Sequence, residues 1–444
     1  MKSVLCLDLG ASSGRAVIAT YDNNNNLNLQ EVHRFPTKTL LENEKTYWDF
    51  SYILKEIKFG IKKALEIDEN IQSIGIDTWG CDYGWLDRDG NLLRNPRSYR
   101  TPMEEKILQE VHEKISMEDH YEICGNGHFS FNSIYQLYYD INYENILENG
   151  AQEFLFMPNL IFYHLTGKKI WEYTIASTSG LLNAQERNWS KTIFQKLNLP
   201  WKIKGELTYP NSTNYSLTEE IKKELNLNKN IEVVCVPGHD SACAILSTKL
   251  NEETGYLING TWSLLGIETD RAITNSLGIK KGLVNEGSAR NKIRFMSMIV
   301  GTWLLQSLRN HWREQGENID FEDFPILGKR SSLEEYIEIT EEFLNCKNME
   351  SLIKNKYFEK YNQEINSKED ILKITYNSLG NKYKESLELI KSLSNKNINN
   401  IVLLGGGNQD SFLIETIEKY LECPISLGPI EASVTGNALM QLKK

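Results

Sequence analysis

Hydrophobic runs of β-strand type recur along the chain, and loops of small or polar residues follow most of them. The predicted strands cover residues 3–7, 16–21, 29–35, 73–77, 83–86, 233–236, 255–258, 264–268, 292–297, 401–404 and 424–427. Apolar positions at helical spacing predict helices near 51–66, 103–115, 133–147, 157–166, 241–246, 301–315, 369–395, 409–421 and 431–442. Strands that alternate with helices predict the α/β class.

One order of elements occurs twice. A strand, a loop of Gly, Ser or Thr and a second strand span residues 5–18, and the same order returns at 255–268. Two related halves, each opening with a phosphate-type hairpin, predict a duplicated α/β domain pair that closes on a nucleotide. We place the boundary near residue 246, which gives domains 1–246 and 247–444.

Composition narrows the possible partners. The chain has 444 residues, 40% of them hydrophobic, and a net charge of −11 without a long basic tract. Nucleic acid and anionic membranes are therefore not expected partners. Seven scattered cysteines without a C-x-x-C pair indicate reduced thiols, and no apolar run approaches the roughly 20 residues of a membrane span. The first residues also lack the apolar core of a signal peptide, so we expect a soluble cytoplasmic protein.

The first hairpin loop is the first candidate for chemistry. Asp8 ends a strand, small residues follow it, and Arg15 begins the return. Amides and hydroxyls of such a loop can hold a phosphate, and a strand-end carboxylate can hold Mg²⁺ through water. The alternative is a plain Gly/Ser hairpin that binds no ligand, but Asp8 and Arg15 on either side of the loop disfavour it.

Two further segments leave alternatives open. Asp77 and Asp82 flank an aromatic residue and a glycine after a buried strand, which suits sugar hydroxyls or, equally, a turn. His120, Cys124 and His128 have a four-residue spacing, but glycines interrupt the helix that would align them and no fourth ligand is evident. The pattern therefore favours no metal at these three residues.

The segment 231–244 contains the candidate base. Pro237 and Gly238 interrupt an apolar strand, so His239 and Asp240 lie at its exit, where open α/β folds bind ligands. A carboxylate held there is a plausible general base. Local sequence alone favours an N-cap for the helix from 241, because Asp is a preferred N-cap residue. The two hairpins and the late glycine turn favour catalysis, and the two roles are compatible.

A glycine turn at 405–407 follows the predicted strand 401–404. Three glycines between a strand and a helix permit a flat or anionic ligand to approach the backbone closely. Asp410 stands where the last glycine of G-x-G-x-x-G belongs, so a nicotinamide fold is disfavoured.

Several separated segments share one pattern with a known family. They are residues 8–15, 73–80, 131–132, 135–137, 157–158, 171–174, 239–240, 260–263, 285–287, 303–306, 405–407 with 409, and 428–429 through 431–432 to 436–437. Together they resemble the sugar kinases of the FGGY family, most closely its rhamnulokinase branch, in family order from residue 4 to residue 442. The first two segments are fairly specific to that branch, whereas the glycine triplet marks the wider family.

The resemblance implies two actin/hexokinase-like (ribonuclease H-like) domains that flank a cleft for ATP and sugar. The domain 1–246 would carry the sugar side, and 247–444 the nucleotide side. By position, Asp240 would be the general base and Asp8 would face Mg²⁺. The residues implied at the sugar are Gly80, His239, Asp240 and Ser241. The residues implied at ATP are Ala11, Ser12, Ser13, Gly14, Arg15, Thr261, Gln306 and Gly406.

Some positions depart from the family pattern. Met298 replaces an Asn that meets ATP, Gly238 replaces a Ser, Asp410 replaces an Asn, and Thr101 stands where Asp is expected. The chain also stops soon after Gly436-Asn437. These changes bear on substrate and nucleotide details rather than on Asp8 or Asp240.

The prediction is therefore an ATP- and Mg²⁺-dependent kinase that phosphorylates L-rhamnulose at its 1-hydroxyl. L-fuculose or another ketose is the alternative substrate, and a catalytically silent sugar or nucleotide sensor is the alternative class. The sequence leaves open whether the protein is a monomer or a homodimer.

Overall fold

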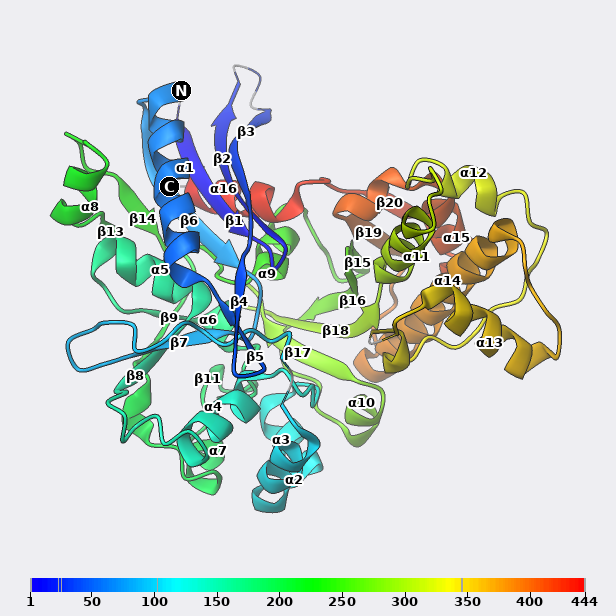
Figure 1. Ribbon diagram of the computed structural model, residues 1–444, viewed down its shortest axis with the longest axis horizontal. Coiled ribbons are helices and arrows are strands. Elements are labelled where there is room, and N and C mark those ends of the chain that lie inside the picture. Colours follow the sequence, from blue (N-terminus) through cyan, green and yellow to red (C-terminus); the bar gives the residue numbers. More distant parts are fainter. Residues whose placement is uncertain (1, 23, 25, 102, 345, 443–444) are drawn as a thin grey trace. The chain divides into compact units, whose positions relative to one another are not determined.

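The computed structural model describes residues 2–22, 24, 26–101, 103–344 and 346–442 (Figure 1). Apart from the residues left undescribed, the chain forms two compact units. Unit 1 comprises residues 1–247, 269–294 and 432–444, and unit 2 comprises 248–268 and 295–431. Unit 1 is therefore built from three separate segments of the chain. The assignment of 1–246 to the sugar and 247–444 to the nucleotide remains a prediction.

A mixed six-stranded sheet forms the centre of unit 1. Its strand order is β13 (Asn214–Ser216), β14 (Glu232–Val234), β6 (Ile71–Thr78), β1 (Ser3–Leu9), β2 (Ser13–Tyr21) and β3 (Leu27–Pro36). Every residue of β1 is buried, as expected for a short apolar run covered on both faces. β1 pairs antiparallel with β2 and parallel with β6, so the predicted hairpin is present.

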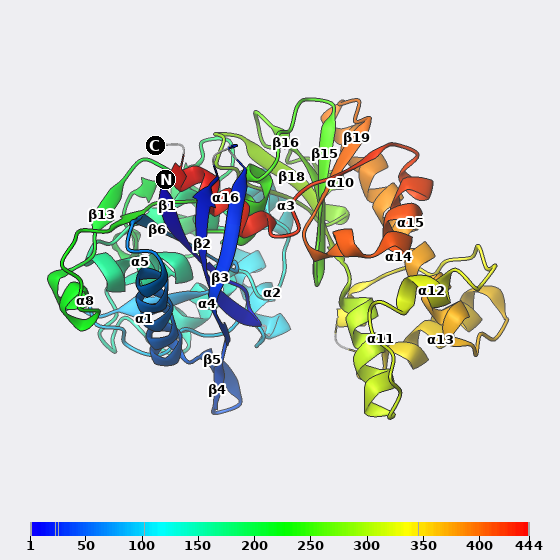
Figure 2. The same ribbon diagram turned by 90° about the horizontal axis from the view of Figure 1, so that it is seen from above.

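Helices cover both faces of this sheet. Alternate residues of β1 point to opposite faces, so Leu5 and Leu7 belong to one hydrophobic cluster and Val4 and Cys6 to another. The first cluster includes the apolar stripe of α1 (Phe50–Ile67), whose N-cap is Asp49. The second includes α16 (Ala432–Leu442), the last helix of the chain, which packs against β1, β6 and α9 (Asp240–Leu246) (Figure 2).

The rest of unit 1 lies mainly between β6 and β14 in the sequence. Its strands are β4 (Thr39–Glu42), β5 (Lys45–Trp48), β7 (Tyr83–Leu86), β8 (Glu153–Phe156), β9 (Trp171–Glu172), β10 (Leu182–Asn183), β11 (Asn188–Trp189), β12 (Leu207–Thr208) and β17 (Leu283–Gly287). Its helices are α2 (Glu105–Lys114), α3 (Met117–Cys124), α4 (Ser133–Asn142), α5 (Met157–Thr166), α6 (Tyr173–Ala176), α7 (Lys191–Lys196), η1 (Trp201–Ile203), α8 (Glu219–Glu224) and α10 (Ser276–Lys280).

Unit 2 repeats the arrangement of unit 1 around a second sheet. β18 (Ile293–Val300), β16 (Trp262–Thr269), β15 (Thr254–Asn259), β19 (Asn400–Leu404) and β20 (Ile425–Leu427) follow one another across it. β15 pairs antiparallel with β16 and parallel with β19, as β1 does with β2 and β6, so the repeated order predicted from the sequence is present. Its helices are α11 (Trp303–Glu314), α12 (Phe324–Gly328), η2 (Glu341–Leu344), α13 (Met349–Tyr361), α14 (Lys368–Ser394), η3 (Gly406–Gln409) and α15 (Ser411–Leu421).

Two further expectations concern the whole chain. All seven cysteines are free in the described structure, as the sequence predicts. Among the helices of the described residues, none has both the length and the apolar character that a membrane crossing needs.

Candidate functional site

Two aspartates lie at the carboxyl ends of neighbouring parallel strands in unit 1. Asp8 on β1 is in register with Asp77 on β6, and both side chains are buried. Arg15 is opposite Asp8 on β2, and its Nε lies 3.1 Å from Asp8 Oδ2, to which Nη2 also donates. The hairpin therefore brings together the predicted metal ligand and the arginine predicted at phosphate, and here the arginine neutralises the aspartate.

Asp77 has one satisfied oxygen and one unsatisfied oxygen. Oδ2 accepts a hydrogen bond of 2.6 Å from Asn437 Nδ2 of α16, whereas Oδ1 is buried without a donor among the described residues. Burial, followed by the negative charge of Asp8, raises the pKa of Asp77 well above its usual value. Two buried carboxylates this close favour either a shared proton or a cation.

The loop between β1 and β2 is held by its own backbone and by its neighbours. The loop residues predicted at phosphate are Ala11, Ser12, Ser13 and Gly14. The Gly10 amide donates to Ser13 O at 3.0 Å, the Thr37 amide donates to Ser12 O at 3.1 Å, and Arg100 Nη2 donates to Ala11 O at 2.7 Å. These hydrogen bonds fix the conformation of the loop, and the guanidinium of Arg100 lies beside it.

The loop after β6 contains one glycine that faces the candidate base and one aspartate that does not. A Cβ at Gly80 would lie 3.3 Å from His239 Nε2, so the two residues are neighbours. Asp82 is buried, and its Oδ2 accepts hydrogen bonds from Trp48 Nε1 at 2.6 Å and Trp79 Nε1 at 2.9 Å, while Gln136 Nε2 donates to Oδ1 at 3.3 Å. Because donors of the protein take both oxygens, Asp82 holds the tryptophans in place and does not fit the sugar-hydroxyl interpretation.

The segment after β14 continues alongside β6. β14 ends at Val234, two residues before the predicted end of the strand at 236. The Thr78 amide donates to Gly238 O at 2.9 Å, and the Gly238 amide donates to the buried Glu172 Oε2 at 2.9 Å. A Cβ at Gly238 would lie 2.9 Å from that oxygen, so packing accounts for Gly where the family pattern has Ser.

Asp240 is the first residue of α9, and His239 is the N-cap. The interpretation of Asp240 as the N-cap is therefore wrong by one residue. Asp240 Oδ1 accepts the Ser241 amide at 2.5 Å, and its side chain is 36% exposed. Burial raises the pKa of Asp240, His239 opposes this effect, and the charge of Asp8 adds to it. A carboxylate that is solvent-accessible on one side and has a raised pKa suits proton acceptance.

Sequence reasoning missed the arginine that organises this segment. Arg294 of β18 is fully buried and donates to Glu286 Oε2 at 2.6 Å, to Ser241 Oγ at 2.7 Å and to Gly287 O at 3.0 Å. Its Nη2 also lies 3.1 Å from His239 Nδ1. His239 Nδ1 also lies 3.3 Å from Glu286 Oε2, and His239 Nε2 lies 3.5 Å from Asp240 Oδ1, so the imidazole is held between Arg294 and two carboxylates. The only signal in the sequence is the segment 285–287, which contains the partner Glu286.

In unit 2, two residues predicted at the nucleotide lie together. Thr261 lies in the two-residue turn between β15 and β16, and its Oγ1 lies 3.5 Å from Gln306 Oε1 on α11. Gln306 Nε2 contacts Thr302 Oγ1 at 3.2 Å, and the Thr302 amide donates to Gly260 O at 2.9 Å. The turn and the first part of α11 therefore form one connected polar surface.

The glycine turn of unit 2 leaves its backbone accessible at Gly406, and the helix that follows it explains why residue 410 is Asp where the family pattern has Asn. A Cβ at Gly406 would have no neighbour within 4 Å, so the backbone there is accessible. Asp410 is the N-cap of α15 and accepts the Phe412 and Leu413 amides at 3.0 and 2.9 Å. Helix capping thus accounts for Asp at 410, whereas Met298 is a half-buried residue of β18 with no capping role.

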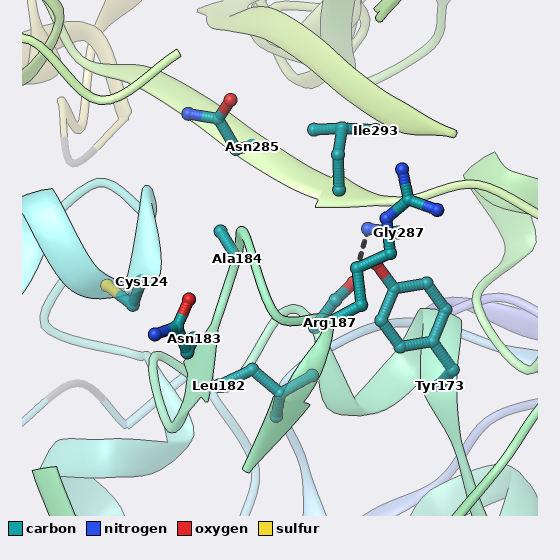
Figure 3. Close-up of a pocket in the computed structure, with 10 residues that line it drawn as sticks. Cys124, Tyr173, Leu182, Asn183, Ala184, Arg187, Asn285, Gly287 and Ile293 are labelled. Atoms are coloured by element: carbon teal, nitrogen blue, oxygen red, sulfur yellow. Dashed lines mark hydrogen bonds between the residues drawn. The ribbon is translucent and has the colours of Figure 1, made fainter. Parts of the chain in front are cut away.

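A small pocket in unit 1 adjoins the contacts of Arg294, because Gly287, whose carbonyl accepts from Arg294, lines it. It is lined by side chains that include Tyr173, Arg187 and Asn285, and the Gly287 amide donates to Ser177 Oγ at 2.7 Å within it (Figure 3). None of the residues predicted at sugar, metal or nucleotide lines this pocket.

Sequence comparison identifies relatives over almost the whole chain. Residues 3–247 match the N-terminal domain of the FGGY family of carbohydrate kinases. A rhamnulokinase of Bacteroides thetaiotaomicron is 32% identical over 99% of this chain and 90% of its own length. A rhamnulokinase of Oceanobacillus iheyensis is 33% identical over 99% of this chain and 92% of its own length.

Structure comparison identifies the same fold class. A xylulose kinase from Lactobacillus acidophilus superposes with a TM-score of 0.81 at 15% identity, covering 100% of this chain and 90% of the other. Plasmodium falciparum glycerol kinase with ADP gives a TM-score of 0.77 at 14% identity, covering 99% and 89% of the two chains. The predicted two-domain actin/hexokinase-like α/β fold is thereby confirmed.

Proposed function

Because the chain belongs to the FGGY family of carbohydrate kinases, we propose that it transfers the γ-phosphate of ATP to the 1-hydroxyl of L-rhamnulose. The observation that carries the proposal is Asp240, a partly exposed carboxylate with a raised pKa beside His239 and Ser241, which Arg294 holds. The rhamnulokinase relatives support the choice of sugar.

Asp240 acts as the general base in this proposal. Its carboxylate takes the proton of the 1-hydroxyl while that oxygen forms a bond to the γ-phosphorus, and the bond from phosphorus to the bridging oxygen of ADP breaks. The products are the sugar 1-phosphate, ADP and, after Asp240 is deprotonated, one proton. A raised pKa makes Asp240 a stronger base.

The sugar is bound in this proposal by Gly80, His239 and Ser241. Gly80 leaves room beside the imidazole, because a side chain there would meet His239 Nε2. The Glu286–Arg294 pair fixes His239 and Ser241 before the sugar arrives, so little freedom is lost on binding. Glu286 and Arg294 are therefore positioning residues, not catalytic ones.

The oxygen donors beside the first hairpin fit Mg²⁺. Asp8 supplies a carboxylate, and Asp77 Oδ1 is a buried oxygen without a donor among the described residues, which is the donor chemistry that Mg²⁺ prefers. When bound, the ion neutralises phosphate charge. The chain's own residues hold the phosphates through the hairpin 11–15, with Arg15 beside Asp8.

Unit 2 contains three of the residues that we assign to the nucleotide. The turn at Thr261, the neighbouring Gln306 and the accessible backbone at Gly406 supply polar groups and open space in unit 2. Met298 lacks the amide of the family's Asn, so we expect weaker binding of ATP and an unchanged transfer step.

A coupled ADP-release assay over a panel of ketoses, with aldoses as controls, tests the proposal. We expect L-rhamnulose to give the highest kcat/KM, and the reaction to stop when Mg²⁺ is chelated. A preference for L-fuculose or another ketose would keep the kinase and change its substrate.

Met298 motivates one second candidate, a sensor that binds without transfer. Calorimetry with L-rhamnulose and ATP, followed by ADP measurement with both present, separates the two. Binding of both ligands without release of ADP would replace the kinase proposal with the sensor.

A further inference from the structure

Three histidines gather in unit 1 away from the proposed kinase site. His112 is on α2, His120 is on α3 and His128 is in the loop that follows α3. One nitrogen of each ring lies within 4.8 Å of the corresponding nitrogens of the other two. The spacing in the sequence suggested His120 and His128 with Cys124, but the fold brings His112 to the pair instead. From this cluster we propose that His112, His120 and His128 form a zinc site.

Main-chain carbonyls select the tautomers that a metal requires. His120 Nε2 lies 2.8 Å from Gly180 O, and His112 Nδ1 lies 3.1 Å from Ile115 O. A carbonyl oxygen only accepts, so each of these nitrogens carries the proton and the other nitrogen of each ring keeps its lone pair. This is the outer-shell contact that orients histidine ligands in zinc sites.

The ring nitrogens of His120 and His128 face one another: His128 Nε2 donates to the lone pair of His120 Nδ1, and binding of zinc would move that proton to His128 Nδ1. His120 Nδ1 lies 3.1 Å from His128 Nε2. Two nitrogens bound to one tetrahedral zinc at about 2.0–2.1 Å are separated by about 3.4 Å, so this pair needs to move apart by only a few tenths of an ångström. The ring centroids of His112 and His128 are 4.6 Å apart, which leaves the third ligand a side-chain rotation away.

Burial keeps the ligands neutral. His120 is buried, and His112 and His128 are half-buried. Desolvation lowers the pKa of His120 to about 4 and that of His128 to about 2, and it also lowers the pKa of His112. The half-buried pair, His112 and His128, leaves a route for water to a fourth position.

Tyr135 provides a specific test of the arrangement. Its hydroxyl lies 2.7 Å from His112 Nε2, and because that nitrogen has the lone pair, the hydroxyl donates to it. Zinc must displace this hydrogen bond. Imidazole nitrogens are good ligands for zinc and poor ones for Mg²⁺, so the site differs in chemistry from the carboxylates of Asp8 and Asp77. A bound ion would connect α2, α3 and the loop 125–132.

The experiment titrates Zn²⁺ into chelator-treated full-length protein in excess Mg²⁺, by calorimetry and by thermal shift, with Co²⁺ absorption as a probe of geometry. We expect one equivalent of Zn²⁺, a raised melting temperature and an intense tetrahedral Co²⁺ spectrum. His128→Gln should weaken binding by about 100-fold or more and remove the thermal shift. His164→Gln, which removes another half-buried histidine of unit 1, should change neither.

Tyr135→Phe should tighten Zn²⁺ binding by about 2- to 10-fold, because the competing hydrogen bond is lost. Three results would overturn the proposal: no stoichiometric Zn²⁺ binding, equal affinity in His128→Gln and the unmodified protein, or weaker binding in Tyr135→Phe. Circular dichroism of each variant establishes that it is folded. The readout does not depend on kinase activity, so failure here is distinct from failure of the proposed function.

Discussion

Replacing Arg294 with methionine removes the cation at the centre of the His239–Ser241 segment. Methionine has a similar length and no charge, so the change leaves Glu286 buried without its partner. Arg294 is fully buried and Glu286 is 5% exposed, which means that water cannot replace the lost hydrogen bonds. Removal of one partner of a buried ion pair lowers the free energy of unfolding by about 3–5 kcal/mol.

The loss should be smaller when both partners are removed. In Glu286→Gln/Arg294→Met the uncompensated charge is absent, and replacement of a whole buried pair is often close to neutral. We therefore expect a coupling free energy of about 2–3 kcal/mol in the double-mutant cycle. Turnover should fall about 10- to 100-fold in Arg294→Met, because His239 and Ser241 lose the donor that orients them.

The free energy of unfolding of each variant is measured by urea titration, with tryptophan fluorescence as the probe. The probe reports on unit 1, since six of the nine tryptophans lie there. Arg34→Met is the matched control, because Arg34 pairs with Glu31 at the surface, where the side chains are 50% and 38% exposed. That change should lower the free energy of unfolding by less than about 1 kcal/mol. Additive effects within about 0.5 kcal/mol in the Glu286/Arg294 cycle would refute the reasoning.

Three other substitutions test separate parts of unit 1. Asp240→Asn should lower kcat by about two to four decades with little change in ATP affinity, and near-normal turnover would reject the general-base assignment. Asp82→Asn tests a pKa that burial raises to about 6: the folded chain binds that proton more tightly than the unfolded chain, so the stabilisation is fully present below pH ~4 and is lost as the pH rises through about 6. Urea unfolding across pH should therefore show the unmodified protein losing about 3 kcal/mol relative to Asp82→Asn between pH ~4 and ~7, and a constant difference would contradict it. Gly436→Ala places a Cβ 1.7 Å from Cys243 O, so it should separate α16 from α9 and lower the melting temperature by several degrees, whereas Thr435→Ala should not; equal melting temperatures would show that the helices can shift freely.

The sequence predicted most strands and helices because each has a strong local pattern. β1 is apolar throughout, α1 has a clear stripe with Asp49 as its cap, and the repeated hairpins give the duplication. The candidate base was found because a strand, an interruption and a carboxylate are adjacent in the chain. Its neighbour Arg294 was missed, since it is 54 residues beyond Asp240 and nothing near it marks a buried ion pair.

Other features depend on contacts between distant segments, which no local pattern encodes. The residues that flank Asp82 in the sequence are typical of a turn. Its role as a buried acceptor follows from the hydrogen bonds of Trp48 and Trp79, which the sequence does not reveal. The sequence predicted that glycines interrupt the helix between His120 and His128, and this is confirmed, because Gly125 ends α3 in the left-handed conformation with φ 66°. The third histidine comes from another helix.

The position of α16 affects when unit 1 can complete its fold during synthesis. Gln441 donates to Leu5 O at 3.1 Å and accepts from Ser73 at 2.7 Å, and Asn437 donates to Asp77, so the first strands of the chain receive buried partners from its last helix. A nascent chain of residues 1–247 therefore leaves these polar groups unsatisfied. Unit 2 has all its residues by 431, so the unit that emerges first from the ribosome is the one that must wait until last to fold.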